Sequence, residues 1–303
     1  MNNSLVGNGK QKPKKFRIFT EDNIFNFINK AFLCLFSFLV AYPVLYVFFA
    51  SVSSGWAVDT GQVTFFPVDF TLAAYREVFG NMVFWRSYAN SVGVTTIGST
   101  FSMILALPGA YALTKKQVFG NRFFNFALMF TMWFNAGMIP IFLNLQSLNL
   151  LNFAGLIIGF GVLPFAIIIL KSAFLSLPGE LTEAAKIDGA NEFQTFFSIC
   201  LPCIKPAIVT VWLMYAISRW NAFFWAMLVI REERWMLLQV YLRRMIILRE
   251  TQIEAAEFFA LAGHSHQTII YAIIVCSMIP ILIVFPLMQK VFKKGIMEGG
   301  LKG

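Results

Sequence analysis

The chain of 303 residues is 58% hydrophobic and only 13% charged, and its mean hydropathy is +0.70. Soluble domains carry about 25% charged residues, so this composition excludes an ordinary soluble protein and indicates a chain that crosses a membrane several times. Because Lys and Arg near span ends set membrane orientation, the net charge of +9 is assigned to topology, and we expect no nucleic-acid partner.

Six apolar runs predict an all-α polytopic membrane protein with six transmembrane helices, since a span needs about 20 mostly apolar residues. The runs are 27–50, 88–113, 123–143, 154–176, 204–230 and 268–292. We therefore expect a basic cytoplasmic arm at 1–26, a six-span domain at 27–292 and a cytoplasmic tail at 293–303.

The basic residues predict the orientation of these spans. Most Lys and Arg lie before the first span, at 115–122, between spans four and five, and in the tail. With the N-terminus inside, these segments carry the whole net charge of +9. The positive-inside rule then places both termini in the cytoplasm.

The segment 178–206, between spans four and five, is the most polar interruption in the second half of the chain. Pro178 and the helix formers of 180–187 predict one short helix, and Asp188-Gly189 predicts a turn after it. A second helix follows, with one apolar face formed by Phe193, Phe196, Phe197 and Cys200. The pattern suits either docking to a cytosolic protein or an amphipathic helix on the lipid interface.

The letters and spacing of this segment resemble the EAA loop of ABC importer permeases. Glu183-Ala184-Ala185 is followed by Gly189 and, after nine residues, by a helix end with Ile199, Leu201 and Pro202. The chain is similar to carbohydrate importer permeases such as the maltose-transporter G subunit. The resemblance implies a type I ABC importer permease fold and a coupling helix that fits a cleft on the ATPase. The coupling residues it implies are Glu183, Ala184, Ala185, Asp188, Gly189, Ile199, Leu201 and Pro202.

The last residues of the chain carry a second resemblance. The Gly-rich, Lys-Gly ending is similar to a tail that, in such permeases, reaches into the ATPase dimer. The contacting residues it implies are Gly299, Gly300, Lys302 and Gly303.

A third resemblance, to the branch that handles complex oligosaccharides, implies a substrate path. It rests on Trp220-Asn221 in span five and on Asn135 in span three. Stacking of Trp220 on sugar and packing between helices are both open. Arg219 departs from the family pattern, and a charge at bilayer depth costs about 2.5–3.5 kcal/mol on insertion scales. Arg219 either pairs with groups of a second permease or binds an anionic sugar.

The sequence carries no catalytic motif. No Walker motif is present, so we expect this chain not to be an enzyme and ATP and Mg to bind a partner ATPase. We expect no metal, because Cys200 and Cys203 lack a second pair and His264 and His266 are only two ligands.

Together these features predict half of the translocation pore of a sugar or oligosaccharide importer in a bacterial plasma membrane. The implied partners are a second permease in a heterodimer, two ATPase subunits and an extracellular solute-binding protein. The alternatives are a self-contained secondary transporter or channel, and an intramembrane enzyme. The first would need acidic residues well inside a span, and the second a catalytic pair; we find neither in the sequence.

Overall fold

The computed structural model describes residues 21–134, 136–251 and 265–300, and every regular element in these ranges is a helix or a helical turn. The elements are α1 (Glu21–Ser51), α2 (Gly55–Asp59), α3 (Ala73–Gly80), α4 (Met82–Thr114), α5 (Asn121–Trp133), α6 (Met138–Ser147), α7 (Phe153–Ile158), α8 (Pro164–Leu175), α9 (Gly179–Ile187), α10 (Glu192–Gln194), the π-helical turn η1 (Thr195–Cys200), α11 (Leu201–Cys203), α12 (Lys205–Trp220), α13 (Phe223–Val229), the 3-10 turn η2 (Glu233–Trp235), α14 (Leu238–Thr251) and α16 (His266–Gly300).

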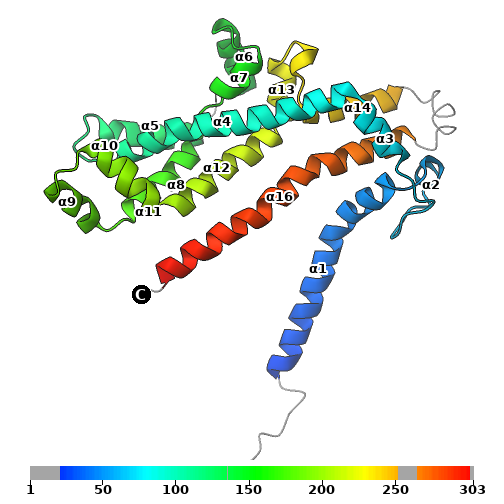
Figure 1. The fold of residues 1–303 in the computed structure, drawn as a ribbon, viewed down its shortest axis with the longest axis horizontal. Coiled ribbons are helices and arrows are strands. Elements are labelled where there is room, and N and C mark those ends of the chain that lie inside the picture. The colour runs from blue at the N-terminus through cyan, green and yellow to red at the C-terminus, as the bar shows by residue number, and fades with distance from the viewer. Residues whose placement is uncertain (1–20, 135, 252–264, 301–303) are drawn as a thin grey trace, which may run out of the picture.

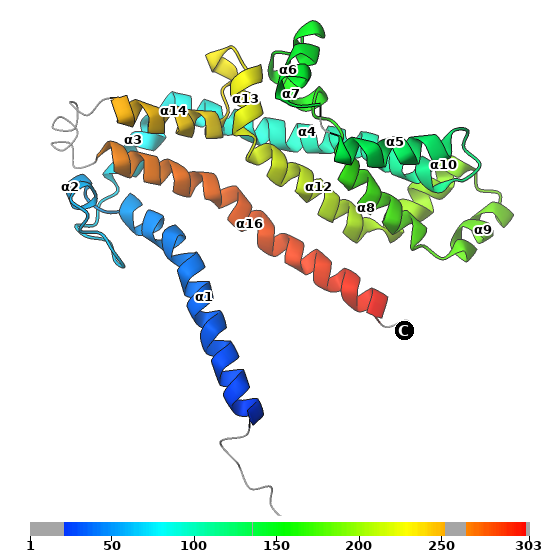
Figure 2. The same ribbon diagram turned by 180° about the vertical axis from the view of Figure 1, so that it is seen from behind.

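The long helix α4 is the centre of the arrangement. It packs most extensively on α12 and α8, and α5 lies alongside α8 (Figure 1). Helix α16 runs beside α14 and α3 and touches α12, while α1 contacts α16 near one end and diverges from the other helices (Figure 2). The buried face of α4 carries small polar side chains, including Ser87, Ser91, Ser99 and Ser102. Small residues allow membrane helices to approach closely, which suits this central position.

Three helices are long and apolar enough to cross a membrane unbroken: Phe25–Ser51 in α1, Met82–Thr114, and His266–Pro286 in α16. The count in the described residues rises to six only if each of three bent helix pairs is one span. The all-α membrane fold predicted from composition is therefore confirmed, but half of the expected spans are interrupted.

The three bent pairs are α5 with α6, α8 with α9, and residues 192–203 with α12. Compared with the predicted spans, the helices break at the following residues. The predicted span 123–143 divides into α5 and α6, which meet at 120°, with Gly137 at a φ of 86° in between. The span 154–176 divides into α7, which ends at Ile158 before Gly159, and α8, which begins at Pro164 after the extended Leu163. The span 204–230 ends early, at Trp220, and α13 starts separately.

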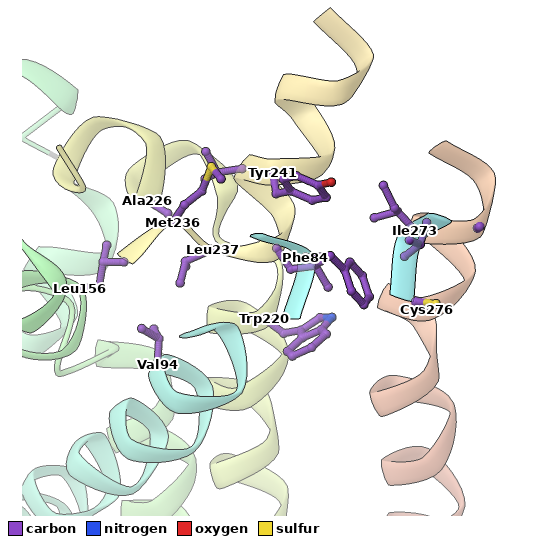
Figure 3. Packing of buried hydrophobic residues seen from close by; sticks show 14 of the residues in the cluster. Phe84, Val94, Leu156, Trp220, Ala226, Met236, Leu237, Tyr241, Ile273 and Cys276 are labelled. Carbon is purple, nitrogen blue, oxygen red and sulfur yellow. The ribbon is translucent and has the colours of Figure 1, made fainter. Parts of the chain in front are cut away.

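The largest hydrophobic cluster joins α4, α12, α14 and α16. Trp220 and Phe84 lie within it, near Ile273 and Cys276 of α16, and Tyr241 of α14 closes one side (Figure 3). A second cluster lies toward the other end of α4 and includes Phe174, Phe196 and Tyr215. The two clusters fix α12 against α4 over most of its length.

Candidate functional site

The EAA segment, residues 178–206, forms one end of the molecule, where α9 projects from the ends of α4 and α8 (Figures 1 and 2). Pro178 begins α9, and Gly189 ends it with a φ of 81°, a conformation that side chains with a Cβ rarely adopt. The turn is closed by two backbone bonds, from Gly189 N–H to Lys186 O (3.1 Å) and from Ala190 N–H to Ala185 O (2.9 Å). The segment is therefore the two-helix elbow that the sequence predicts.

The outer face of α9 is available to a partner. Ala185 is buried, whereas Glu183, Ala184 and Asp188 are exposed, and Ile187 is 86% exposed. Glu183 forms no ion pair within the described part of the chain, and Lys186, three residues further along α9, pairs with Glu192 instead. The face thus offers a carboxylate beside an apolar side chain. Sequence reasoning missed Ile187, whose only local signal is an apolar residue just before Asp-Gly.

The second helix of the EAA segment contains a π-helical turn and divides the expected apolar face. Phe196 and Cys200 are buried, and the Phe196 ring lies 5.0 Å from that of Tyr111 and 6.0 Å from that of Phe174 between centroids. Phe193 and Phe197 instead pair with each other at the exposed surface. Phe196 and Cys200 therefore anchor the segment on α4 and α8, whereas Phe193 and Phe197 stay accessible. Of the implied coupling residues here, Ile199 and Leu201 are half-buried and Pro202 is exposed.

A polar cluster, here the Glu192 tie, fastens this second helix to the end of α4. The Glu192 carboxylate accepts a hydrogen bond from the Tyr111 hydroxyl (2.9 Å) and lies 3.1 Å from Lys115 Nζ and 3.5 Å from Lys186 Nζ. The hydrogen bonds from Tyr111 and then Lys115 hold the pKa of Glu192 below its usual range. Sequence reasoning missed this contact, because Tyr111 and Glu192 stand 81 positions apart.

Comparison with known proteins agrees with this arrangement. The sequence profile of the family described as "Binding-protein-dependent transport system inner membrane component" matches residues 94–298. The chain belongs to this family. The match includes most of α4, the whole EAA segment and nearly all of α16, so it includes the candidate coupling site.

Individual relatives match nearly the whole chain. The polygalacturonan/rhamnogalacturonan transport system permease protein YtcP of Bacillus subtilis (strain 168) is 36% identical, over 93% of this chain and all of its own. The protein LplC of the same organism is 37% identical, over 92% of this chain and 95% of its own. A solved chain from a bacterial ABC transporter involved in import of the acidic polysaccharide alginate is 44% identical, with a TM-score of 0.85 over 90% of this chain and 98% of its own. The fold is that of a type I ABC importer permease.

Two of the expected substrate-path residues of this family member are engaged by the chain itself. Trp220 is buried in the hydrophobic cluster (Figure 3). Its indole N–H donates to Ser277 O (3.0 Å) on α16, and its ring meets that of Tyr88 edge to face. Of the two alternatives for Trp220, this geometry is helix packing. Arg219 is 6% exposed and donates hydrogen bonds to oxygens of this chain, at Leu156 and Ser102. In this conformation the terminal nitrogens of Arg219 are occupied, and Trp220 is only 5% exposed.

The other two expected substrate-path positions differ. Asn221 is exposed at the end of α12, with its amide donating to Ile217 O (3.0 Å), so its side-chain oxygen is left for a ligand. Asn135 lies outside the described residues. A role for Asn221 in the path stays a prediction.

The remaining residues singled out from the sequence are those of the tail and the candidate metal ligands. Helix α16 extends to Gly300 and so includes Gly299, while Lys302 and Gly303 lie outside the described residues. Cys200 and Cys203 are free thiols. The described ranges hold no group of three or more His, Cys, Asp or Glu that could bind a metal ion, and His264 lies beyond them.

Proposed function

We propose that this chain is one of two permease subunits of an ABC importer for oligosaccharides and forms half of its translocation pore. The observation that carries the proposal is the likeness, at 44% identity and a TM-score of 0.85, to a chain of a transporter that imports a polysaccharide. The relative YtcP, a permease of a polygalacturonan and rhamnogalacturonan transport system, supports the same substrate class.

The substrate we propose is an acidic oligosaccharide. Alginate and polygalacturonan are both chains of uronic acids, so the relatives at 44% and 36% identity share a carboxylate-bearing cargo. The carboxylates need not meet Arg219, whose terminal nitrogens are occupied in this conformation. Recognition of charge is then expected in the extracellular binding protein and along the pore wall near Asn221.

The EAA segment is the proposed site of energy coupling. ATP would close the dimer of two ATPase subunits, and α9 would carry that motion into the pore. Exposed Glu183, Ala184 and Ile187 supply a surface for the ATPase, and the Glu192 tie connects that surface to α4. ATP and Mg would bind the ATPase, and this chain would hold no cofactor.

The proposed location is a bacterial plasma membrane, with a second permease subunit alongside and a solute-binding protein outside. The EAA segment and both termini would face the cytoplasm, as the distribution of Lys and Arg favours. Exposed apolar side chains along α1 suit contact with lipid or with the second permease.

Affinity purification of the tagged chain from its native membrane tests the assembly. We expect a second permease and an ATPase to co-purify in a ratio of about one to one to two, as a heterodimeric permease with two ATPases requires. Recovery of this chain alone, with transport driven by an ion gradient, would instead establish a self-contained secondary transporter.

A further inference from the structure

The interruption between α7 and α8, residues 159–163, places non-helical backbone inside a predicted span. Such backbone is tolerated at membrane depth only where protein groups or a cavity satisfy its N–H and C=O groups. The span therefore needs donors for the carbonyls that end α7 and an acceptor for the N–H groups that begin α8. Both come from a single neighbouring helix, α12.

Arg219 supplies the donors. Its Nη1 donates to Leu156 O (2.6 Å), and its Nη2 lies within bonding distance of Phe160 O (3.0 Å) and Ile157 O (3.3 Å). The same Nη2 reaches Ser102 Oγ on α4 at 2.8 Å. One guanidinium thus gathers three carbonyls at the end of α7 and ties them to α4 and α12.

Tyr215 supplies the acceptor at the other side of the interruption. Its hydroxyl oxygen accepts a hydrogen bond from Leu163 N–H (3.1 Å), immediately before Pro164. Tyr215 and Arg219 are four residues apart, so they lie one turn apart on the same face of α12. The pair therefore holds both ends of the interruption from one rigid helix.

Gly98 on α4 leaves the room that the guanidinium occupies. A Cβ at this position would stand 2.6 Å from Arg219 Nη1, closer than atoms can pack. The guanidinium cannot simply move aside, because its terminal nitrogens are already bound to fixed carbonyls. The position of Arg219 thus depends on three helices at once.

A cavity adjoins this junction. Its volume is about 220 Å³, and it is lined by Arg219, Tyr215, Phe160 and Leu163 together with Ser218 and Trp225. The Arg219 Nε–H, next to it, has no hydrogen-bond partner in the described chain. The interruption forms one wall of the cavity, so whatever holds the interruption also shapes the cavity.

We propose that Arg219 and Tyr215 are positioning residues that pin the α7–α8 interruption to α12, and that Arg219 is not a ligand for the sugar. Because α12 begins at the end of the EAA segment, we expect the two to move together. The pinning then keeps the cavity wall attached to α12 during that motion. This structural claim does not depend on the nature of the substrate.

Amide hydrogen exchange of the intact purified complex tests the pinning. In Tyr215→Phe we expect peptides spanning 159–166 to exchange about three- to tenfold faster, the effect of one lost hydrogen bond. Arg219→Gln should accelerate the same peptides further, and Arg219→Lys should fall between, because an ammonium keeps the charge but not the planar fork. Tyr42→Phe and Arg231→Gln are the matched controls, since neither forms a side-chain hydrogen bond to this region.

Gly98→Ala provides a variant that leaves both pinning residues in place. As a single substitution, Gly98→Ala should accelerate exchange in 159–166. Added to Arg219→Gln it should have little further effect, because the guanidinium that the new Cβ would clash with is already absent. If Arg219→Gln fails to assemble, Tyr215→Phe and Gly98→Ala decide the question. Unchanged exchange of these peptides in both would overturn the proposal.

Uptake kinetics separate pinning from substrate binding, and this second readout rests on the proposed function. We expect Tyr215→Phe and Arg219→Gln to lower the maximal rate for an oligouronate and a neutral oligosaccharide alike, with KM unchanged. A rise in KM for the oligouronate alone would show that Arg219 binds the substrate carboxylate, and would contradict our assignment.

Discussion

At the residue scale, the unpaired carboxylate of Glu183 bears on the two interpretations of the EAA segment. A helix resting on lipid keeps its charges on the face opposite its apolar residues. Glu183 and Ile187 are four residues apart and share one face of α9, as a docking face with a charged contact and an apolar anchor would need. Lys186, the residue that would otherwise neutralise Glu183, is directed to Glu192 instead. The local geometry therefore favours a protein partner.

Replacing Glu183 with Ala should weaken ATPase binding by about 1.4 kcal/mol, which is about tenfold in affinity. The measurement is the amount of ATPase retained by the purified permease during a dilution series. Glu180→Ala is the matched control, since Glu180 is exposed in the first turn of the same helix. Equal retention by wild type and Glu183→Ala would remove this residue from the interface.

Gly189 gives a test that depends on backbone conformation. Nothing lies within 4 Å of a Cβ added there, so any loss comes from the φ of 81° and not from a clash. Gly189→Val should destabilise the elbow by about 1–3 kcal/mol and reduce ATPase docking. Gly189→Asn should keep most of the ATPase docking, because Asn tolerates the left-handed region. Comparable losses in both variants would show that φ is not the cause.

At the element scale, the Glu192 tie and the pinned interruption connect the EAA segment to the pore. The first joins the second helix of the segment to the end of α4, and the second joins α12 to α7 and α8. Motion of α9 can thus reach two neighbouring spans through specific contacts. Coupling through such contacts predicts that weakening them lowers transport per ATP more than it lowers ATP hydrolysis.

Glu192→Gln keeps an acceptor for Tyr111 but loses the attraction to both lysines. Because the Glu192 side chain is 58% exposed, we expect a cost below about 1 kcal/mol, and a fall of less than about fivefold in sugar transported per ATP. Glu192→Ala should cost more, since the hydrogen bond from Tyr111 is lost as well. Glu233→Gln, which breaks an exposed pair with Arg244 at the other end of the molecule, is the control.

The lowered pKa of Glu192 sets the pH dependence of this tie. The stabilisation is present above the usual Glu pKa of about 4.3 and is lost as the pH falls through the lowered pKa of the folded state. The difference between wild type and Glu192→Gln in transport per ATP should therefore be constant from about pH 6 to 8. A difference that changes within this range would mean that another group controls the coupling.

The tail is the remaining element with a proposed partner. Deleting 299–303 removes the last residues of α16 and the Lys-Gly ending, and should reduce sugar-stimulated ATP hydrolysis if the tail enters the ATPase dimer. ATPase assays of the reconstituted complex measure this. Stimulation equal to that of the intact chain would show that the tail makes no functional contact.

The elements also show what the sequence could predict. Composition and the Pro-Gly pattern predicted the membrane fold and the elbow at Gly189, because these depend on local preferences. The interruption at 159–163 and the Glu192 tie depend on contacts between distant residues, such as Arg219 with Leu156 and Tyr111 with Glu192. Arg219 was therefore recognised as unusual from its position, whereas its acceptors became visible only in the fold.

At the scale of the whole molecule, half of an importer pore accounts for features that a self-contained carrier would not need. Exposed apolar side chains cover much of α1, and the EAA segment lies at one end of the molecule (Figure 1). The exposed side chains of α1 suit lipid or a second permease, and we propose that the exposed face of α9 meets the ATPase. The account therefore depends on assembly, on ATP and on a sugar delivered from outside.

The most direct test is uptake of a labelled oligouronate into proteoliposomes that contain the purified complex. We predict uptake that requires internal ATP and external binding protein, and that is abolished when the ATPase is omitted. We also predict that a neutral oligosaccharide of equal length enters at least about tenfold more slowly, a difference of about 1.4 kcal/mol. Uptake without ATP, or equal uptake of both sugars, would contradict the account.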